Sequence, residues 1–121
     1  MDFELTEEQK IIQATVRDFA RNELAPVADE FDQAEEFPRN NFKRMAELGL
    51  TGMILPPEYG GSGSSELSLA IAAEEIATAC ASTADILNSH LVIGSCPIYH
   101  YGTEAQKQKF LPPLAKGERI S

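Results

Sequence analysis

Apolar residues recur at helical intervals near the amino end of the chain. The stripe consists of Ile12, Val16 and Phe19, with Ile11 and Ala20 beside it. Intervals of four and three residues place such side chains on one face of a helix. Residues 6–9, Thr-Glu-Glu-Gln, precede the stripe and form a capping box, in which Thr6 and Gln9 each satisfy a free backbone amide. The pattern therefore predicts a helix that begins directly after Thr6.

Prolines and glycines divide the next part of the chain. Pro26 predicts a kink in the first helix or the start of a second one. Pro38 leads into a further helical pattern that Gly49 is suited to end. Residues 50–65 contain Pro-Pro and Gly-Gly-Ser-Gly, which do not continue a helix at low cost, so we expect an ordered loop around Tyr59.

Two apolar helices are expected in the second half of the chain. Residues 65–80 are rich in alanine and place Leu69, Ala73, Ile76 and Cys80 on one face. Their acidic residues, Glu66, Glu74 and Glu75, are expected to face water. Residues 82–95 are apolar on nearly every side, which predicts a central helix covered by several others.

The carboxyl end predicts two short helices. Residues 103–106, Thr-Glu-Ala-Gln, form a second capping box, and Pro112-Pro113 leads into a last short helical segment. No segment alternates apolar and polar residues as a strand does. At 121 residues the chain has room for one domain, residues 1–121. The fold class expected is therefore all-α, a bundle of about five to six helices.

Charge and composition exclude several functions. The net charge is −9, and such a surface repels phosphate backbones and anionic lipids, so we expect no nucleic-acid and no membrane partner. The chain shows no apolar stretch long enough for a bilayer and no export signal. With only two cysteines and no disulfide scaffold, we expect a cytoplasmic location.

The residues alone show no catalytic set. Gly-Gly-Ser-Gly at 60–63 lacks the Gly-Lys-Ser/Thr of a phosphate-binding loop and is interpreted as a tight turn. Cys96 and His100, four residues apart, would need further ligands to hold zinc, so no metal site is expected. Neighbouring glutamates such as Glu74 and Glu75 diverge around a helix and do not share a proton. We therefore expect no catalytic and no metal-binding residue in this chain.

The order of the segments nevertheless resembles the amino-terminal helical domain of the acyl-CoA dehydrogenase family. The resemblance covers the whole chain, and each segment alone is common. The segments that carry it are Leu5-Thr6-Glu7-Glu8-Gln9, Val16-Arg17-Asp18-Phe19-Ala20, Glu23-Leu24-Ala25-Pro26, Phe37-Pro38, Ala46-Glu47-Leu48-Gly49-Leu50, Pro57-Glu58-Tyr59-Gly60-Gly61 and Tyr101-Gly102-Thr103-Glu104-Ala105-Gln106-Lys107. Seven such segments in this order make a chance match implausible.

This resemblance implies a flavoprotein of fatty acid metabolism. Members of the family remove hydrogens from Cα and Cβ of an acyl-CoA thioester and give trans-2-enoyl-CoA. A glutamate takes the α-proton, FAD accepts the β-hydride, and an electron transfer flavoprotein reoxidises the flavin. Relatives are commonly homo-oligomers.

Relatives continue past Ile120-Ser121 into a flavin-binding β-domain and a second helical domain. Because neither is present in this chain, we expect it to be inactive alone and to expose apolar surface where the other domains pack. One alternative is a stand-alone helical module that binds a protein or an acyl group. Another is the same domain of a related flavin oxidase or monooxygenase.

The family's pocket-forming helix matches residues 82–95. The alignment implies that Ser89 and Ile93, with Leu87 and Cys96, face or adjoin the pocket for the acyl chain. Plain core packing is the competing interpretation of these four side chains. The resemblance assigns no cofactor-binding residue to this chain, because the principal FAD site of the family lies in the domains that follow.

Overall fold

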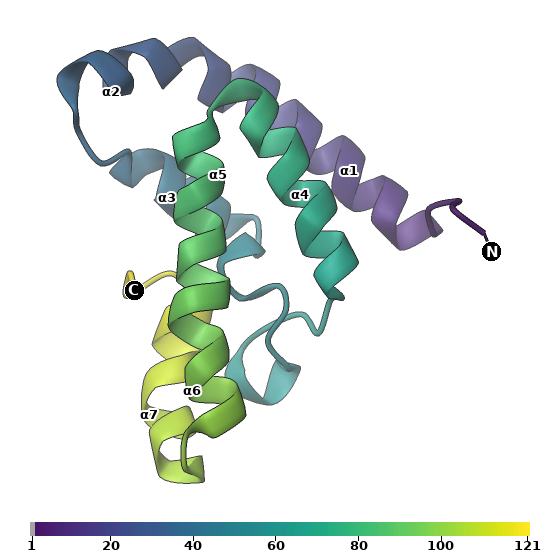
Figure 1. Cartoon of the computed structure of the whole chain (residues 1–121), viewed down its shortest axis with the longest axis vertical. Helices are drawn as coiled ribbons and strands as arrows, with labels where there is room; N and C mark the ends of the chain where they lie inside the picture. Colours follow the sequence, from purple (N-terminus) through teal and green to yellow (C-terminus); the bar gives the residue numbers. More distant parts are fainter. Residues whose placement is uncertain (1) are drawn as a thin grey trace.

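The computed structural model describes residues 2–121, and all regular elements in this range are helical. The α-helices are α1 (Glu7–Phe19), α2 (Ala28–Ala34), α3 (Arg39–Glu47), α4 (Glu66–Ala79), α5 (Ala81–Asn88), α6 (Cys96–Tyr101) and α7 (Glu104–Ala115). Short π- and 3-10 segments connect α1 to α2, and a π segment connects α5 to α6 without a break. Five continuous helical runs result, which confirms the all-α bundle of five to six helices (Figure 1).

The helix starts follow the capping signals of the sequence. At α1 the hydroxyl of Thr6 accepts the Gln9 backbone N–H at 3.1 Å, and the Gln9 side chain accepts the Thr6 N–H at 2.9 Å. The same reciprocal pair joins Thr103 and Gln106 at α7. α3 ends where Gly49 takes a left-handed conformation, with φ of +79°. These local predictions are confirmed.

Two expectations at prolines are settled by the structure. Pro26 lies in the 3-10 turn Ala25–Val27, directly before α2 begins at Ala28. The helical run therefore changes its hydrogen-bonding pattern at Pro26, and a second α-helix follows. The expected helix boundary at Pro112-Pro113 is wrong, because α7 runs through both prolines to Ala115. The N–H groups that these prolines lack would have bonded carbonyls of Gln108 and Lys109, which are exposed residues that water can reach.

The core has two parts. The larger cluster packs side chains from α1, α3, α4 and α5, from the π segments that follow α1 and α5, and from the loop after α3. Its fully buried members include Leu24, Met45, Ile76, Leu87 and Leu91. The smaller cluster joins the loop after α3 to α7 and consists of Leu55, Tyr59, Leu111 and Ala115, with Ile98 and Tyr99 of α6 against it. The run from α5 to α6 and the loop after α3 each contact both clusters.

Two expectations about exposure are wrong. Glu75 does not face water: it is only 8% exposed, because it lies between α4 and α1 and pairs with Arg17. Ile11 lies outside the core and is 65% exposed, since α1 packs through Val16 and Phe19 instead. The helix at 82–95 is covered on several sides as expected, with Leu87 and Leu91 fully buried, although Val92 and Ile93 face outward. Within residues 2–121, no helix has the length and apolar character needed to span a membrane.

Candidate functional site

The run from α5 through the π segment Ser89–Ser95 to α6 crosses the middle of the domain. In Figure 1 it passes from the end where α3 and α4 lie to the end where α7 lies. It carries all four residues that the resemblance places at an acyl pocket. Their surroundings decide what this element can do.

The structure separates the four residues instead of gathering them around one cavity. Leu87 is fully buried in the larger core cluster, so its side chain packs against other helices. Ser89 and Cys96 are half-buried. Ile93 is 73% exposed and its neighbour Val92 is 49% exposed. The outward strip is therefore formed by Val92 and Ile93, with Ser89 one turn before them, and its role at a pocket stays a prediction.

Cys96 has the character of a structural thiol. Burial raises its pKa above the ordinary value of 9.0, and the negative charge of Glu66 raises it further. A thiol with a raised pKa holds its proton at neutral pH and is a poor nucleophile and metal ligand. Cys96 therefore serves as a small packing residue next to the exposed strip.

His90 is the residue of this element that sequence reasoning did not assign to a site. Its side chain is fully buried, its Nε2 lies 2.8 Å from the carbonyl oxygen of Leu114, and its ring meets Phe42 edge to face at 5.1 Å. Because a carbonyl only accepts, Nε2 carries the proton and donates. Burial lowers the pKa of His90 below its ordinary 6.5. The neutral ring therefore connects the π segment to α7 and α3.

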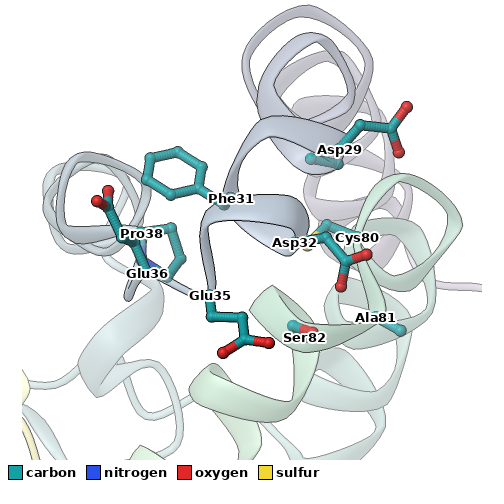
Figure 2. Close-up of a pocket in the computed structure, with 10 residues that line it drawn as sticks. Asp29, Phe31, Asp32, Glu35, Glu36, Pro38, Cys80, Ala81 and Ser82 are labelled. Atoms are coloured by element: carbon teal, nitrogen blue, oxygen red, sulfur yellow. The ribbon is translucent and has the colours of Figure 1, made fainter.

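A separate hollow of about 420 Å³ lies between the end of α2 and the start of α5. Its lining includes the carboxylate side chains of Asp29, Asp32, Glu35 and Glu36. Figure 2 shows Glu36 on one side of the hollow and Asp32 on the other, with Cys80 next to Asp32. Among the residues that line it there is no cation. An acidic hollow repels the anionic phosphates of a CoA ester.

Metal ligands do not converge in the described part of the chain. Among residues 2–121, no group of three or more His, Cys, Asp and Glu side chains is placed to hold an ion. Cys96 and His100 lie on α6, but a third ligand does not join them. His100 is exposed and stacks edge to face on Tyr99.

Exposed apolar surface is abundant, as expected from the sequence. A second hollow of about 420 Å³ lies between α6 and α7, and its walls come from Pro97, Ile98, Tyr101, Gly102, Gln106 and Phe110. Phe3, Ile11 and Leu67 are large apolar side chains that also face outward from other elements. Apolar surface of this extent is typical of a domain that packs against further protein.

The comparison with protein families decides the identity of this bundle. The family model described as acyl-CoA dehydrogenase, N-terminal domain, matches residues 6–118. The chain belongs to the acyl-CoA dehydrogenase family. The resemblance found in the sequence is therefore confirmed.

Individual relatives support the same family. A probable acyl-CoA dehydrogenase, YngJ, of Bacillus subtilis is 50% identical over 120 residues, which is 99% of this chain and 32% of that protein. A short-chain specific acyl-CoA dehydrogenase of Clostridium acetobutylicum is 48% identical, again over 99% of this chain and 32% of that protein. The three-dimensional structure of butyryl-CoA dehydrogenase from Megasphaera elsdenii matches with a TM-score of 0.92 at 36% identity, over 99% of this chain and 32% of that one. The chain thus spans about a third of the length of these relatives.

The glycine-rich turn at 60–63 is the segment of this acyl-CoA dehydrogenase domain to compare with a phosphate site for FAD. Free backbone N–H groups in such a turn would bind the flavin's phosphates. The turn's N–H groups point inward instead: Gly61 donates to Pro56, Ser62 to Gly52, Gly63 to Leu55 and Ser64 to Met53, all at backbone carbonyls. These residues do not fit a phosphate, and the turn is structural.

Proposed function

We propose that the chain is the amino-terminal helical domain of an FAD-dependent acyl-CoA dehydrogenase. The proposed reaction is the α,β-dehydrogenation of an acyl-CoA thioester to trans-2-enoyl-CoA. The observation that carries the proposal is the family match over residues 6–118. In this proposal a flavin-binding β-domain and a second helical domain supply the glutamate base and the FAD site, and residues 1–121 alone do not turn over substrate.

The contribution of this domain is the shape of the acyl pocket. Val92 and Ile93 present apolar surface outward from the central helical run, and Ser89 lies one turn before them. An apolar wall on a packed helix excludes water from the acyl chain and limits its length. Leu87 supports this wall from the core, and Cys96 fills the space beside it.

The proposed substrates are short acyl-CoA esters. The Clostridium acetobutylicum relative is named short-chain specific, and the Megasphaera elsdenii structure is a butyryl-CoA dehydrogenase. The proposed partners are an electron transfer flavoprotein, which reoxidises the FAD, and further copies of the same subunit in a homo-oligomer. A cytoplasmic location and a role in fatty acid metabolism belong to the same proposal.

The test replaces Ile93 in the complete enzyme. Ile93→Phe enlarges the exposed side chain, and Ile11→Phe makes the same change at an exposed isoleucine on α1. The measurement is kcat/KM for acyl-CoA esters of four to twelve carbons with an artificial electron acceptor. We expect Ile93→Phe to lower kcat/KM for the longer esters by about tenfold relative to butyryl-CoA, the effect of losing space for one or two methylenes.

The outcomes separate the proposal from its competitors. Ile11→Phe should leave the chain-length profile unchanged. An unchanged profile in Ile93→Phe would remove Ile93 from the pocket wall. A complete enzyme that consumes no acyl-CoA ester would refute the proposed activity. A native gene product with the mass of residues 1–121 alone would favour a stand-alone binding module.

A further inference from the structure

The central helical run contains an inserted residue at the exposed strip. The backbone N–H of Cys96 donates to the carbonyl of Leu91, five residues earlier, where a regular α-helix spans four. The side chain of Ser95 donates to the carbonyl of His90 across the same interval, at 3.1 Å. One inserted residue turns every later side chain by about 100° relative to a regular α-helix.

This insertion changes which side chains share a face. Ser89 is the first residue of the π segment, Ile93 lies near its end, and Cys96 begins α6 directly after it. The direction of Ile93 relative to Ser89 therefore depends on whether the π turn is present. Ile93 forms the proposed acyl wall together with Val92, and Ser89 lies one turn before them, so the shape of that wall depends on the π turn.

The π turn is held in place by residues outside its own helix. The His90 ring donates from Nε2 to Leu114 of α7 at 2.8 Å and packs against Phe42 of α3. The backbone N–H of Ser121 lies 3.4 Å from Nδ1, which accepts. Both nitrogens of the ring and its contact with Phe42 thus tie this turn to other segments, and rotation of the turn would break those contacts.

The carbonyl group of His90 is also occupied. It accepts the hydroxyl of Ser95 and the hydroxyl of Ser121, each at 3.1 Å. Gly94 makes this close approach feasible, since a Cβ there would lie 1.9 Å from the Ser121 hydroxyl oxygen. Because the His90 carbonyl oxygen has two lone pairs and accepts two hydroxyl groups, a return of this turn to the α-helical pattern would displace one of them.

We propose that His90 and Ser95 are positioning residues for acyl-chain selection, which act by holding the π turn and so fixing the direction of Ile93. This inference rests on the proposed function of the exposed strip. Neither residue touches the acyl chain in this scheme. His90 fixes the turn to α7 and α3, and Ser95 closes it from within.

The experiment uses the complete enzyme with Ser95→Ala. Ser95→Thr keeps the hydroxyl and serves as the rescue. Thr83→Val is the matched control, because Thr83 is a fully buried hydroxyl on the same helix that donates to Cys80, away from the π turn. The measurements are kcat and KM for butyryl-CoA and octanoyl-CoA, with flavin content and melting temperature for each variant.

We expect Ser95→Ala to change the ratio of the two kcat/KM values by about threefold or more, mainly through KM, because a turned wall alters how well each chain fits. Ser95→Thr should return the wild-type ratio, and Thr83→Val should not alter it. An unchanged ratio in flavin-loaded Ser95→Ala would overturn the inference, as would an equal change in Thr83→Val. Wild-type enzyme without acyl-CoA activity would instead refute the proposed function.

His90 gives a second, independent variant. His90→Gln keeps a side-chain N–H donor for Leu114, whereas His90→Leu removes it. We expect the substrate ratio to follow wild type in His90→Gln and to shift in His90→Leu. Equal ratios in both variants would show that the His90 hydrogen bond does not position the strip. If Ser95→Ala does not fold, this pair decides the question.

Discussion

Arg17 of α1 and Glu75 of α4 form a two-pronged ion pair, with Nε 3.1 Å from Oε2 and Nη2 2.7 Å from Oε1. The two residues lie 58 positions apart in the sequence. Glu75 is nearly buried, whereas the Arg17 side chain is 43% exposed. The bidentate geometry fixes the relative position of two helices that also share the larger core.

Glu75→Gln is expected to destabilise the domain by about 1 kcal/mol, a reduced value because Arg17 remains partly hydrated. Glu74→Gln, at the exposed neighbouring position, is the control and should change stability little. The hydrogen bond from Arg17 lowers the pKa of Glu75 below its ordinary 4.5, so this stabilisation is present above pH 4.5 and is lost as the pH falls. Urea unfolding at pH 7 and at pH 3.5 measures both effects. An equal loss of unfolding free energy in Glu75→Gln and Glu74→Gln would show that the ion pair with Arg17 does not stabilise the domain.

His90 should make stability pH-dependent in a higher range. Burial lowers its pKa below 6.5, so the unfolded chain binds a proton more readily than the folded one. The stabilisation is therefore complete above pH 6.5 and decreases as the pH falls below that value. Urea unfolding across this range should show the decrease in wild type and in His100→Gln, whose imidazole is exposed, and a smaller decrease in His90→Gln. A pH profile identical in all three proteins would contradict the prediction.

Alanine should destabilise the glycine-rich turn much more at Gly61 than at Gly63. A Cβ at Gly61 would lie 2.0 Å from the Leu55 carbonyl oxygen and 2.4 Å from that of Gly52, both backbone atoms. At Gly63 the nearest atom would be 3.5 Å away, so only its positive φ of +67° is costly. We expect Gly61→Ala to destabilise by more than about 3 kcal/mol and Gly63→Ala by about 1 kcal/mol. Thermal unfolding of the two variants measures the difference, and equal melting temperatures would contradict it.

Two neighbours in the π segment should respond in opposite ways. Leu91 is fully buried, so Leu91→Ala should cost about 2–5 kcal/mol. Ile93 is mostly exposed, so Ile93→Gln should change the stability of the domain by no more than about 0.5 kcal/mol. Removing its apolar surface should also reduce self-association of the 121-residue chain, which sedimentation at increasing concentration measures. A large stability loss in Ile93→Gln would show that this side chain is part of the core.

Features that depend on nearby residues were predictable from the sequence. The capping boxes at Thr6 and Thr103 and the stop at Gly49 involve residues within one helical turn, and the structure confirms each of them. The helical character of residues 65–80 and 82–95 follows from composition and spacing, and it is also confirmed. The family was identifiable because seven short segments occur in one order.

Features that depend on distant contacts were not predictable. The burial of Glu75 requires knowledge that Arg17 lies beside it, and spacing along α4 gives no sign of that partner. The π turn has no recognisable sequence signature. It is defined by hydrogen bonds of Leu91 and His90, and the partner of the His90 ring lies in another helix. Residues 82–95 are apolar on nearly every side, so their pattern did not show that Val92 and Ile93 face outward.

The division of the interior into two clusters has a consequence for how the domain opens. The smaller cluster contains four buried residues, Leu55, Tyr59, Leu111 and Ala115, and it holds α7 against the loop. Local opening that releases α7 exposes little apolar surface and should occur more often than global unfolding. Amide hydrogens of α7 should therefore exchange with deuterium faster than those of α4, whose Ile76 lies in the larger cluster. The central helical run, anchored in both clusters, would keep its α5 end protected while its α6 end becomes accessible.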